Sequence, residues 1–311
     1  MAEMRARSDP DGNAGPREIW AWAMYDFANS GYTTVVITAI FNAYFVAVVA
    51  GGAPWATFAW TAALSLSYAL VIVTAPVIGA YADLRANKKR LLLFTTAGCV
   101  IGTAALALAG PGDLAIAVAC VVVSNFFFCT GCDLVAAFLP ELARGRNLGK
   151  VSGWGWSLGY IGGLLTLGVC LAYVSWAQAA SQTAAQFVPV TMLITAALFA
   201  LASLPTFAML RERARPQPLP AGASLIASAF ARLADTLSHA ALYQDLRRFL
   251  VCIVFYQAGV QTVITLAAIY AEQAMGFNTR DTLILVLVVN VTAALGAFFF
   301  GNVQDRIGHV P

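Results

Sequence analysis

Apolar residues lie along this 311-residue chain in eight long blocks, separated by short segments that often contain glycine or proline. Each block approaches or exceeds 20 residues, the length that a helix needs to cross a hydrocarbon core of ~30 Å. The blocks cover approximately residues 20–49, 55–82, 90–109, 114–139, 151–176, 187–210, 249–271 and 282–303. The pattern predicts an all-α integral membrane protein. Pro76, Pro189 and Pro205 do not argue against these spans, because neighbouring helices can satisfy the freed carbonyls.

Composition agrees with this class. The chain is 60% hydrophobic and 11% charged, whereas soluble domains are roughly 45–50% apolar and about 25% charged. A net charge of +3 without a basic stripe excludes nucleic acid as a partner. The six cysteines all fall inside apolar blocks, so we expect free thiols that pack as small apolar residues. Cys129 and Cys132, followed by Asp133, lack further ligands nearby, so we expect no metal and no cofactor.

Basic residues indicate the orientation of the chain. With the N-terminus inside, 17 of the 18 Lys and Arg residues are cytoplasmic, and Arg280 alone is outside. This asymmetry predicts a multi-pass protein of the inner or plasma membrane with a cytoplasmic N-terminus.

A long-period repeat divides the chain. The segment from Gly79 to Asp83 (GAYAD) ends the second block, and the segment from Gly301 to Asp305 (GNVQD) ends the eighth, 222 residues later. Six spans per period is the organisation of two-halved transporters.

Both copies resemble the loop signature of the major facilitator superfamily. Gly79, Asp83 and Lys88 match the signature in the first copy, and the second copy matches at Gly301, Asp305, Arg306 and Gly308. Residues 22–36, 138–163 and 247–264 are similar to the bacterial relatives of the fungal vacuolar amino-acid effluxer. The resemblance implies a major facilitator fold whose two acidic helix ends form a cytoplasmic gate.

This organisation predicts four regions. They are a disordered cytoplasmic tail at 1–17, an N-terminal six-helix bundle at 18–210, a cytoplasmic loop at 211–248, and the first two helices of a second bundle at 249–311. Within the loop, apolar residues recur every four positions from Leu225 to Ala241. An amphipathic interfacial helix and a loose linker are equally favoured there. If the halves are equivalent, about 120 residues would follow Pro311, so we expect a C-terminally incomplete transporter whose last two helices dock loosely.

Polar residues at helical spacing mark the candidate transport site. Three helices carry such stripes, which contain Asp26, Asn29 and Thr33; Asn125, Cys129 and Asp133; and Gln257, Gln261 and Thr265. An ionised aspartate in the bilayer costs about 2.5–3.5 kcal/mol on insertion scales, so such residues usually face a cavity or a partner. The resemblance places these three helices, together with Tyr32, around a central cavity. The alternative is that the polar groups only join helices.

A glycine strip follows in the fifth block. Gly155, Gly159 and Gly163 recur every four residues and remove side chains along one face, which favours a close helix crossing.

The leading hypothesis is a secondary active transporter that moves a small polar solute by alternating access. Amino acids as substrates and efflux as direction come from the resemblance alone. The expected partners are a small-molecule substrate, the lipid bilayer and, where Asp26 couples transport, protons. The alternatives are a non-transporting membrane scaffold or truncated remnant, and an integral membrane enzyme. The enzyme is the weakest of these, because it needs paired carboxylates or a His/Cys set at one depth.

Overall fold

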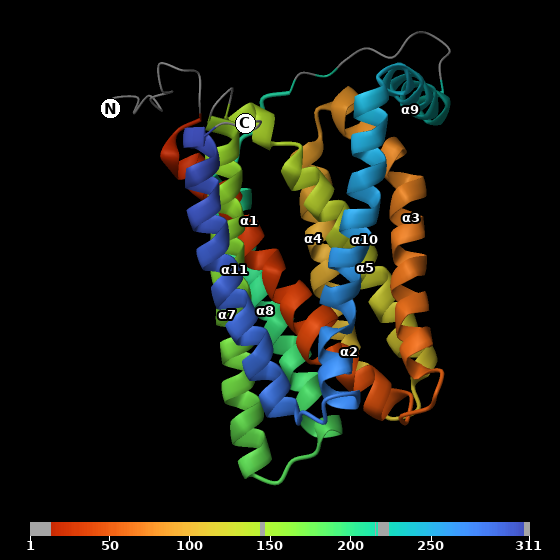
Figure 1. The fold of residues 1–311 in the computed structure, drawn as a ribbon, viewed down its shortest axis with the longest axis vertical. Helices are drawn as coiled ribbons and strands as arrows, with labels where there is room; N and C mark the ends of the chain where they lie inside the picture. The colour runs from red at the N-terminus through yellow and green to blue at the C-terminus, as the bar shows by residue number, and fades with distance from the viewer. Residues whose placement is uncertain (1–13, 144–146, 215, 217–223, 308–311) are drawn as a thin grey trace.

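The computed structural model describes residues 14–143, 147–214, 216 and 224–307. Within these residues all regular structure is helical (Figure 1). The elements in chain order are α1 (Pro16–Tyr32), η1 (Thr33–Ala39), α2 (Phe41–Tyr44), η2 (Phe45–Val49), α3 (Ala56–Arg85), α4 (Lys88–Ala105), η3 (Leu106–Leu108), α5 (Leu114–Ala136), α6 (Leu139–Leu142), α7 (Asn147–Ala179), α8 (Ala184–Met209), α9 (Leu225–Leu242), α10 (Gln244–Gln273) and α11 (Thr279–Ile307).

Seven of the described helical segments are long and apolar enough to cross a membrane. They coincide with the first seven predicted spans to within a few residues. The eighth predicted span lies inside α11, whose apolar stretch among the described residues, Ile284–Ala297, is shorter. Helices α3 and α8 continue through Pro76, Pro189 and Pro205, as expected.

The first span is not a uniform α-helix. Its middle, η1, and its end, η2, have the wider π-helical turn. Ile40, with φ −111° and ψ −60°, joins η1 to the short α-helical segment α2. A π-helical turn takes more residues than an α-helical turn, so side chains after Tyr32 leave the register that α1 predicts. Such segments are frequent at functional sites.

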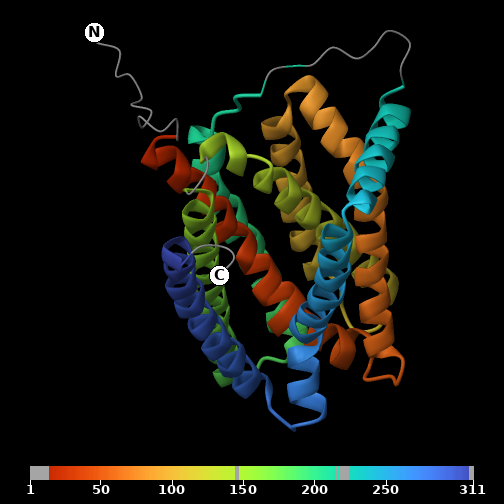
Figure 2. The same cartoon turned by 45° about the horizontal axis from the view of Figure 1, so that its top comes forward.

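The long helices alternate in direction, so their termini lie at two opposite ends of the bundle (Figures 1 and 2). At one end α1 and α4 begin and α3 and α8 end; we call this the basic end. The turns at the opposite end contain Gly51, Gly52 and Gly112, all with positive φ. Glycine adopts this left-handed conformation without the steric cost that a Cβ imposes.

Helix α1 runs through the interior and packs against α7 and α8, while α4 pairs with α5 and α5 with α3. Helix α11 lies along α7 (Figures 1 and 2). The expectation of loose docking is therefore wrong for α11, which packs mainly against α7 and also meets α10 and η1. Helix α10 has few buried side chains, which are confined to its last third, from Thr265 onward.

Residues 225–242 form the helix α9, which packs against α3 near the basic end (Figure 1). Ala229 is buried, while Ile226, Phe230 and Leu233 are exposed and apolar.

Candidate transport site

Helix α1 crosses α7 along two strips with the same spacing. Asp26, Ser30 and Thr34 recur every four residues on α1, and Gly155, Gly159 and Gly163 recur every four residues on α7. A Cβ added to these glycines would lie 2.5 Å from Asp26 Oδ2, 2.9 Å from Ser30 Oγ and 2.7 Å from Thr34 Oγ1, respectively. The structure thus places the predicted glycines directly against the polar face of α1.

A fourth glycine, Gly162, comes closest of all. A Cβ at this position would overlap the carbonyl oxygen of Phe27. The two helix backbones touch here, as small residues at helix interfaces in membranes allow. Gly162, Ser30 and Thr34 were not predicted from the sequence, although the shared four-residue spacing marks the last two.

The opposite face of α1 is hydrogen-bonded to α4 and α5. Tyr25 donates to Thr96 Oγ1 at 2.9 Å, since Thr96 itself donates to the Leu92 carbonyl. Tyr32 and Ser124 are joined in the same way at 2.9 Å, and the Tyr32 ring stacks on Phe128. The amide of Asn29 approaches Cys132 Sγ at 3.5 Å.

The predicted stripe on α1 therefore divides between two neighbours. Asp26 faces α7, whereas Asn29 faces α5. Thr33 is half-buried at the start of η1. Asp26 is partly buried, and among the described residues no Lys, Arg or His lies within ion-pairing distance of its carboxylate.

The stripe on α5 has a buried part and an exposed part. Asn125 is buried and donates to Ser67 Oγ of α3 at 2.9 Å. Cys129 is partly buried, and Asp133 is exposed. Among the described residues no three His, Cys, Asp or Glu side chains gather into a metal site.

On α10, Gln257 and Gln261 are exposed, and Thr265 is buried. Neither glutamine is hydrogen-bonded to another described residue. The structure does not bring these side chains into contact with Asp26.

An ionic cluster occupies the basic end. Lys88 Nζ lies 2.9 Å from Glu141 and 3.8 Å from Asp83, and Lys88 and Glu141 are both largely buried. Glu212, just after α8, accepts hydrogen bonds from the backbone N–H groups of Lys88 and Lys89 at 2.7 and 3.3 Å. The Glu212 carboxylate thereby satisfies two donors at the start of α4, where the helix dipole favours negative charge.

The same segment is tied to α1. Glu18 accepts two hydrogen bonds from the Arg213 guanidinium, at 2.6 and 2.8 Å, and one from the Arg211 N–H at 3.0 Å. The hydrogen bond to Glu18 raises the pKa of Arg213 above its ordinary value. Glu18, Glu141 and Glu212 were not predicted from the sequence, since nothing in their local sequence marks partners up to 195 residues away.

The two copies of the loop signature lie on α3 and α11. Gly79 lies within α3 with open space where a Cβ would be. Gly301, Asp305 and Arg306 lie on α11, without a described side-chain environment, and Gly308 falls outside the described residues.

The long apolar helices and the polar interior of α1 are features of a multi-pass membrane transporter of the major facilitator type. The family model described as "Vacuole effluxer Atg22 like" matches residues 46–150 and 145–310. The chain belongs to this family. It is also 28% identical over 293 residues to the uncharacterized MFS-type transporter YxiO of Bacillus subtilis (strain 168), covering 92% of this chain and 67% of that protein. Membership in a transporter family argues against the enzyme alternative.

Proposed function

We propose that this protein is a secondary active transporter that moves a small polar solute by alternating access, with amino acids as the first class to test. The observation that carries the proposal is the carboxylate of Asp26, which lies inside the first span with no described cation beside it. A carboxylate at such a site is costly and is typical of proton relays and solute pathways.

The surroundings of Asp26 suit both of its candidate roles. Its Oδ2 atom faces Gly155, where no side chain competes for it. The carboxylate can therefore take up a proton, or it can accept hydrogen bonds from a substrate ammonium group. Either event removes an unpaired charge from the apolar interior and so changes the free energy of the state that contains it.

Direction and orientation are parts of the same proposal. The family description names an effluxer, so we propose export. The basic end faces the cytoplasm in this scheme, because membrane proteins concentrate Lys and Arg on that side. The membrane is then the inner or plasma membrane, with α9 along its cytoplasmic surface.

The ionic cluster is the proposed gate. Lys88 on α4 forms ion pairs with Glu141 on α6 and Asp83 on α3. The ion pair with Asp83 is the longer, at 3.8 Å, and its carboxylate is exposed, so this ion pair is the one that breaks when the gate opens. Asp305 and Arg306 are the proposed counterparts in the second copy of the signature.

Flux through proteoliposomes tests the proposal. Vesicles containing the protein are loaded with labelled amino acids, and release is followed with and without an imposed pH gradient. We expect gradient-dependent release, abolished in Asp26→Asn and retained in the control Asp245→Asn, whose side chain is fully exposed at the start of α10. Equal flux in wild type and Asp26→Asn at all pH values would contradict the role of Asp26.

The same assay separates transport from the scaffold alternative. A scaffold gives no saturable, solute-specific release with any solute class, although it folds and inserts normally. A thermal-shift screen across amino acids and small metabolites then narrows the substrate, because a ligand that binds the folded state raises its unfolding temperature.

A further inference from the structure

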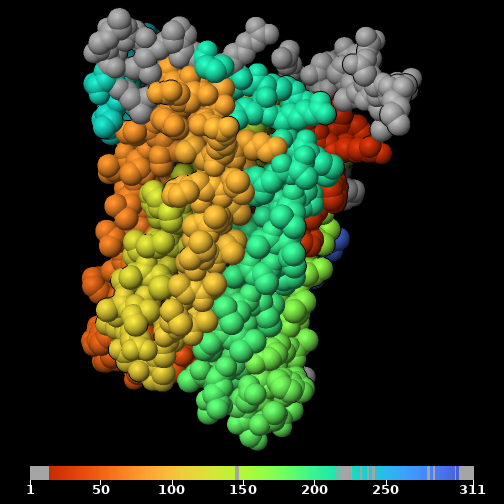
Figure 3. All heavy atoms as spheres, turned by 180° about the vertical axis from the view of Figure 1, so that it is seen from behind, coloured from red at the N-terminus to blue at the C-terminus, as the bar shows by residue number. Residues whose placement is uncertain are grey.

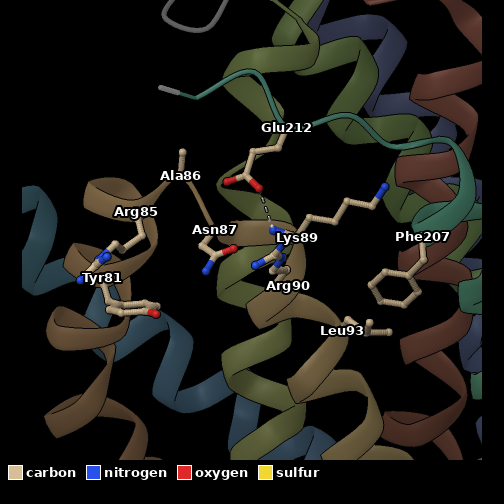
Figure 4. Close-up of a pocket in the computed structure, with 9 residues that line it drawn as sticks. All are labelled: Tyr81, Arg85, Ala86, Asn87, Lys89, Arg90, Leu93, Phe207 and Glu212. Atoms are coloured by element: carbon tan, nitrogen blue, oxygen red, sulfur yellow. Dashed lines mark hydrogen bonds between the residues drawn. The ribbon is translucent and has the colours of Figure 1, made fainter. Parts of the chain in front are cut away.

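A basic pocket at the outer surface of the bundle lies beside the proposed gate and shares Glu212 with its ionic cluster. It has a volume of about 620 Å³ and lies between the end of α3, the start of α4 and the end of α8. Figure 4 shows its lining: Tyr81, Arg85, Ala86, Asn87, Lys89, Arg90, Leu93, Phe207 and Glu212.

The charges of this pocket do not cancel. Three cationic residues, Arg85, Lys89 and Arg90, line the pocket together with one carboxylate, that of Glu212. The ammonium group of Lys89 donates to the Leu210 carbonyl at 2.7 Å. Both Glu212 oxygens already accept N–H groups from the start of α4. Neither arginine forms an ion pair with a described carboxylate. The pocket therefore retains positive charge without an anion from the described part of the chain.

The position of the pocket indicates the source of an anion. Leu93, at the lower wall, is 53% exposed, and its neighbour Phe94 is 64% exposed. Both lie within about one turn of Arg90, so a lipid-facing apolar surface begins where the cationic groups end. Figure 3 shows α4 and α8 side by side on this outer face. A molecule with a phosphate at the membrane interface and acyl chains below it would match both the cationic groups of the pocket and the apolar surface next to them.

We propose that this pocket binds a phosphate-bearing anion, and that the headgroup of an anionic phospholipid is the ligand its position favours. Arg85 and Arg90 supply planar guanidinium groups that can bind phosphate oxygens in pairs. Tyr81 and Asn87 add polar groups to the wall, and Leu93 and Phe207 receive the first methylenes of the lipid. Basic pockets between transmembrane helices bind lipid headgroups in this way.

The test compares lipid binding to the purified full chain in neutral detergent. Phosphatidylglycerol and phosphatidylcholine are titrated separately, and bound lipid is counted by native mass spectrometry. We expect wild type to prefer phosphatidylglycerol. The variant Arg85→Gln/Arg90→Gln should lose about fivefold in affinity for each charge removed, whereas Arg85→Lys/Arg90→Lys should keep most of the preference.

The matched control is Arg247→Gln/Arg248→Gln, which removes two exposed cations at the start of α10, outside the pocket. It should retain the preference of wild type. An equal loss of phosphatidylglycerol affinity in both double variants, or no preference of wild type for phosphatidylglycerol, would overturn the proposal. Either result would mean that anionic lipid is attracted by the overall positive charge and not by this pocket. If Arg85→Gln/Arg90→Gln fails to fold, the exposed single variant Arg90→Gln carries the test with a loss of about fivefold.

A second arm distinguishes lipid from a soluble phosphate compound. Glycerol phosphate and inorganic phosphate are added in place of lipid. Binding of either as tight as that of phosphatidylglycerol, and lost in Arg85→Gln/Arg90→Gln, would keep the anion site but overturn the lipid assignment. Lipid binding without soluble-phosphate binding supports both.

Discussion

Helices α1 and α10 carry similar polar patterns but have different surroundings. In the most apolar stretch of the first span 78% of the residues are buried, against 6% in α10. The tyrosines and the asparagine of α1 reach hydrogen-bond partners on α4 and α5. Gln257 and Gln261 on α10 are exposed. Polar residues at helical spacing thus do not define their own environment, because neighbouring helices decide whether each one is buried and paired.

The largest expected difference concerns the crossing of α1 and α7. Gly162→Ala should destabilise the protein by about 3 kcal/mol, at the upper end for overpacking, because the new Cβ meets the Phe27 backbone. Gly168→Ala on the same helix is the control, since nothing lies within 4 Å of its Cβ position. Thermal unfolding in detergent measures both. Equal stability of the two variants would show that α1 and α7 do not touch as described.

The next effect concerns carboxylates at the basic end. Glu212→Ala should cost about 2 kcal/mol, because two N–H groups at the start of α4 lose a charged acceptor. Asp245→Ala at the start of α10 should cost less than about 0.5 kcal/mol, because Asp245 is fully exposed. Chemical unfolding of the two variants compares these values. A larger cost at Asp245 would reverse the contrast between the two regions.

A smaller difference is expected for polar groups within the spans. Tyr32→Phe removes the hydrogen bond to Ser124 and should cost about 0.6–1.7 kcal/mol, the range for hydrogen bonds between membrane helices. Gln257→Leu should change stability by less than about 0.5 kcal/mol. The unfolding temperatures of both variants provide the measurement. A larger loss of stability in Gln257→Leu than in Tyr32→Phe would contradict the difference between α1 and α10.

The smallest pair exchanges glycine and alanine at two turns. Ala86 adopts φ +47° between α3 and α4, a left-handed conformation that glycine adopts at lower cost. Ala86→Gly should therefore stabilise by up to about 1 kcal/mol. Gly276, between α10 and α11, has φ +70° and open space around it, so Gly276→Ala should destabilise by about 1 kcal/mol. Opposite shifts in unfolding temperature are expected, and a destabilised Ala86→Gly would refute the strain at Ala86.

Length and hydropathy by themselves determined the spans of this protein. Crossing a bilayer requires about 20 apolar residues in a row. Each membrane-spanning helix can therefore be recognised from its own local sequence, even where it contains Pro76 or Pro205. The loop signature and the glycine strip are equally local, and both could be located in the sequence.

Only the tertiary structure decided which helices meet. Asp26 and Asn29 are three residues apart, yet one faces α7 and the other α5. Glu18 and Arg213 pair across 195 residues, and Glu212 caps a helix that begins 124 residues earlier. Such pairings depend on crossing positions, and after Tyr32 on π-helical turns that shift the register. A one-dimensional pattern shows that a face is polar, but the neighbour that satisfies it is set by how close two backbones can pack.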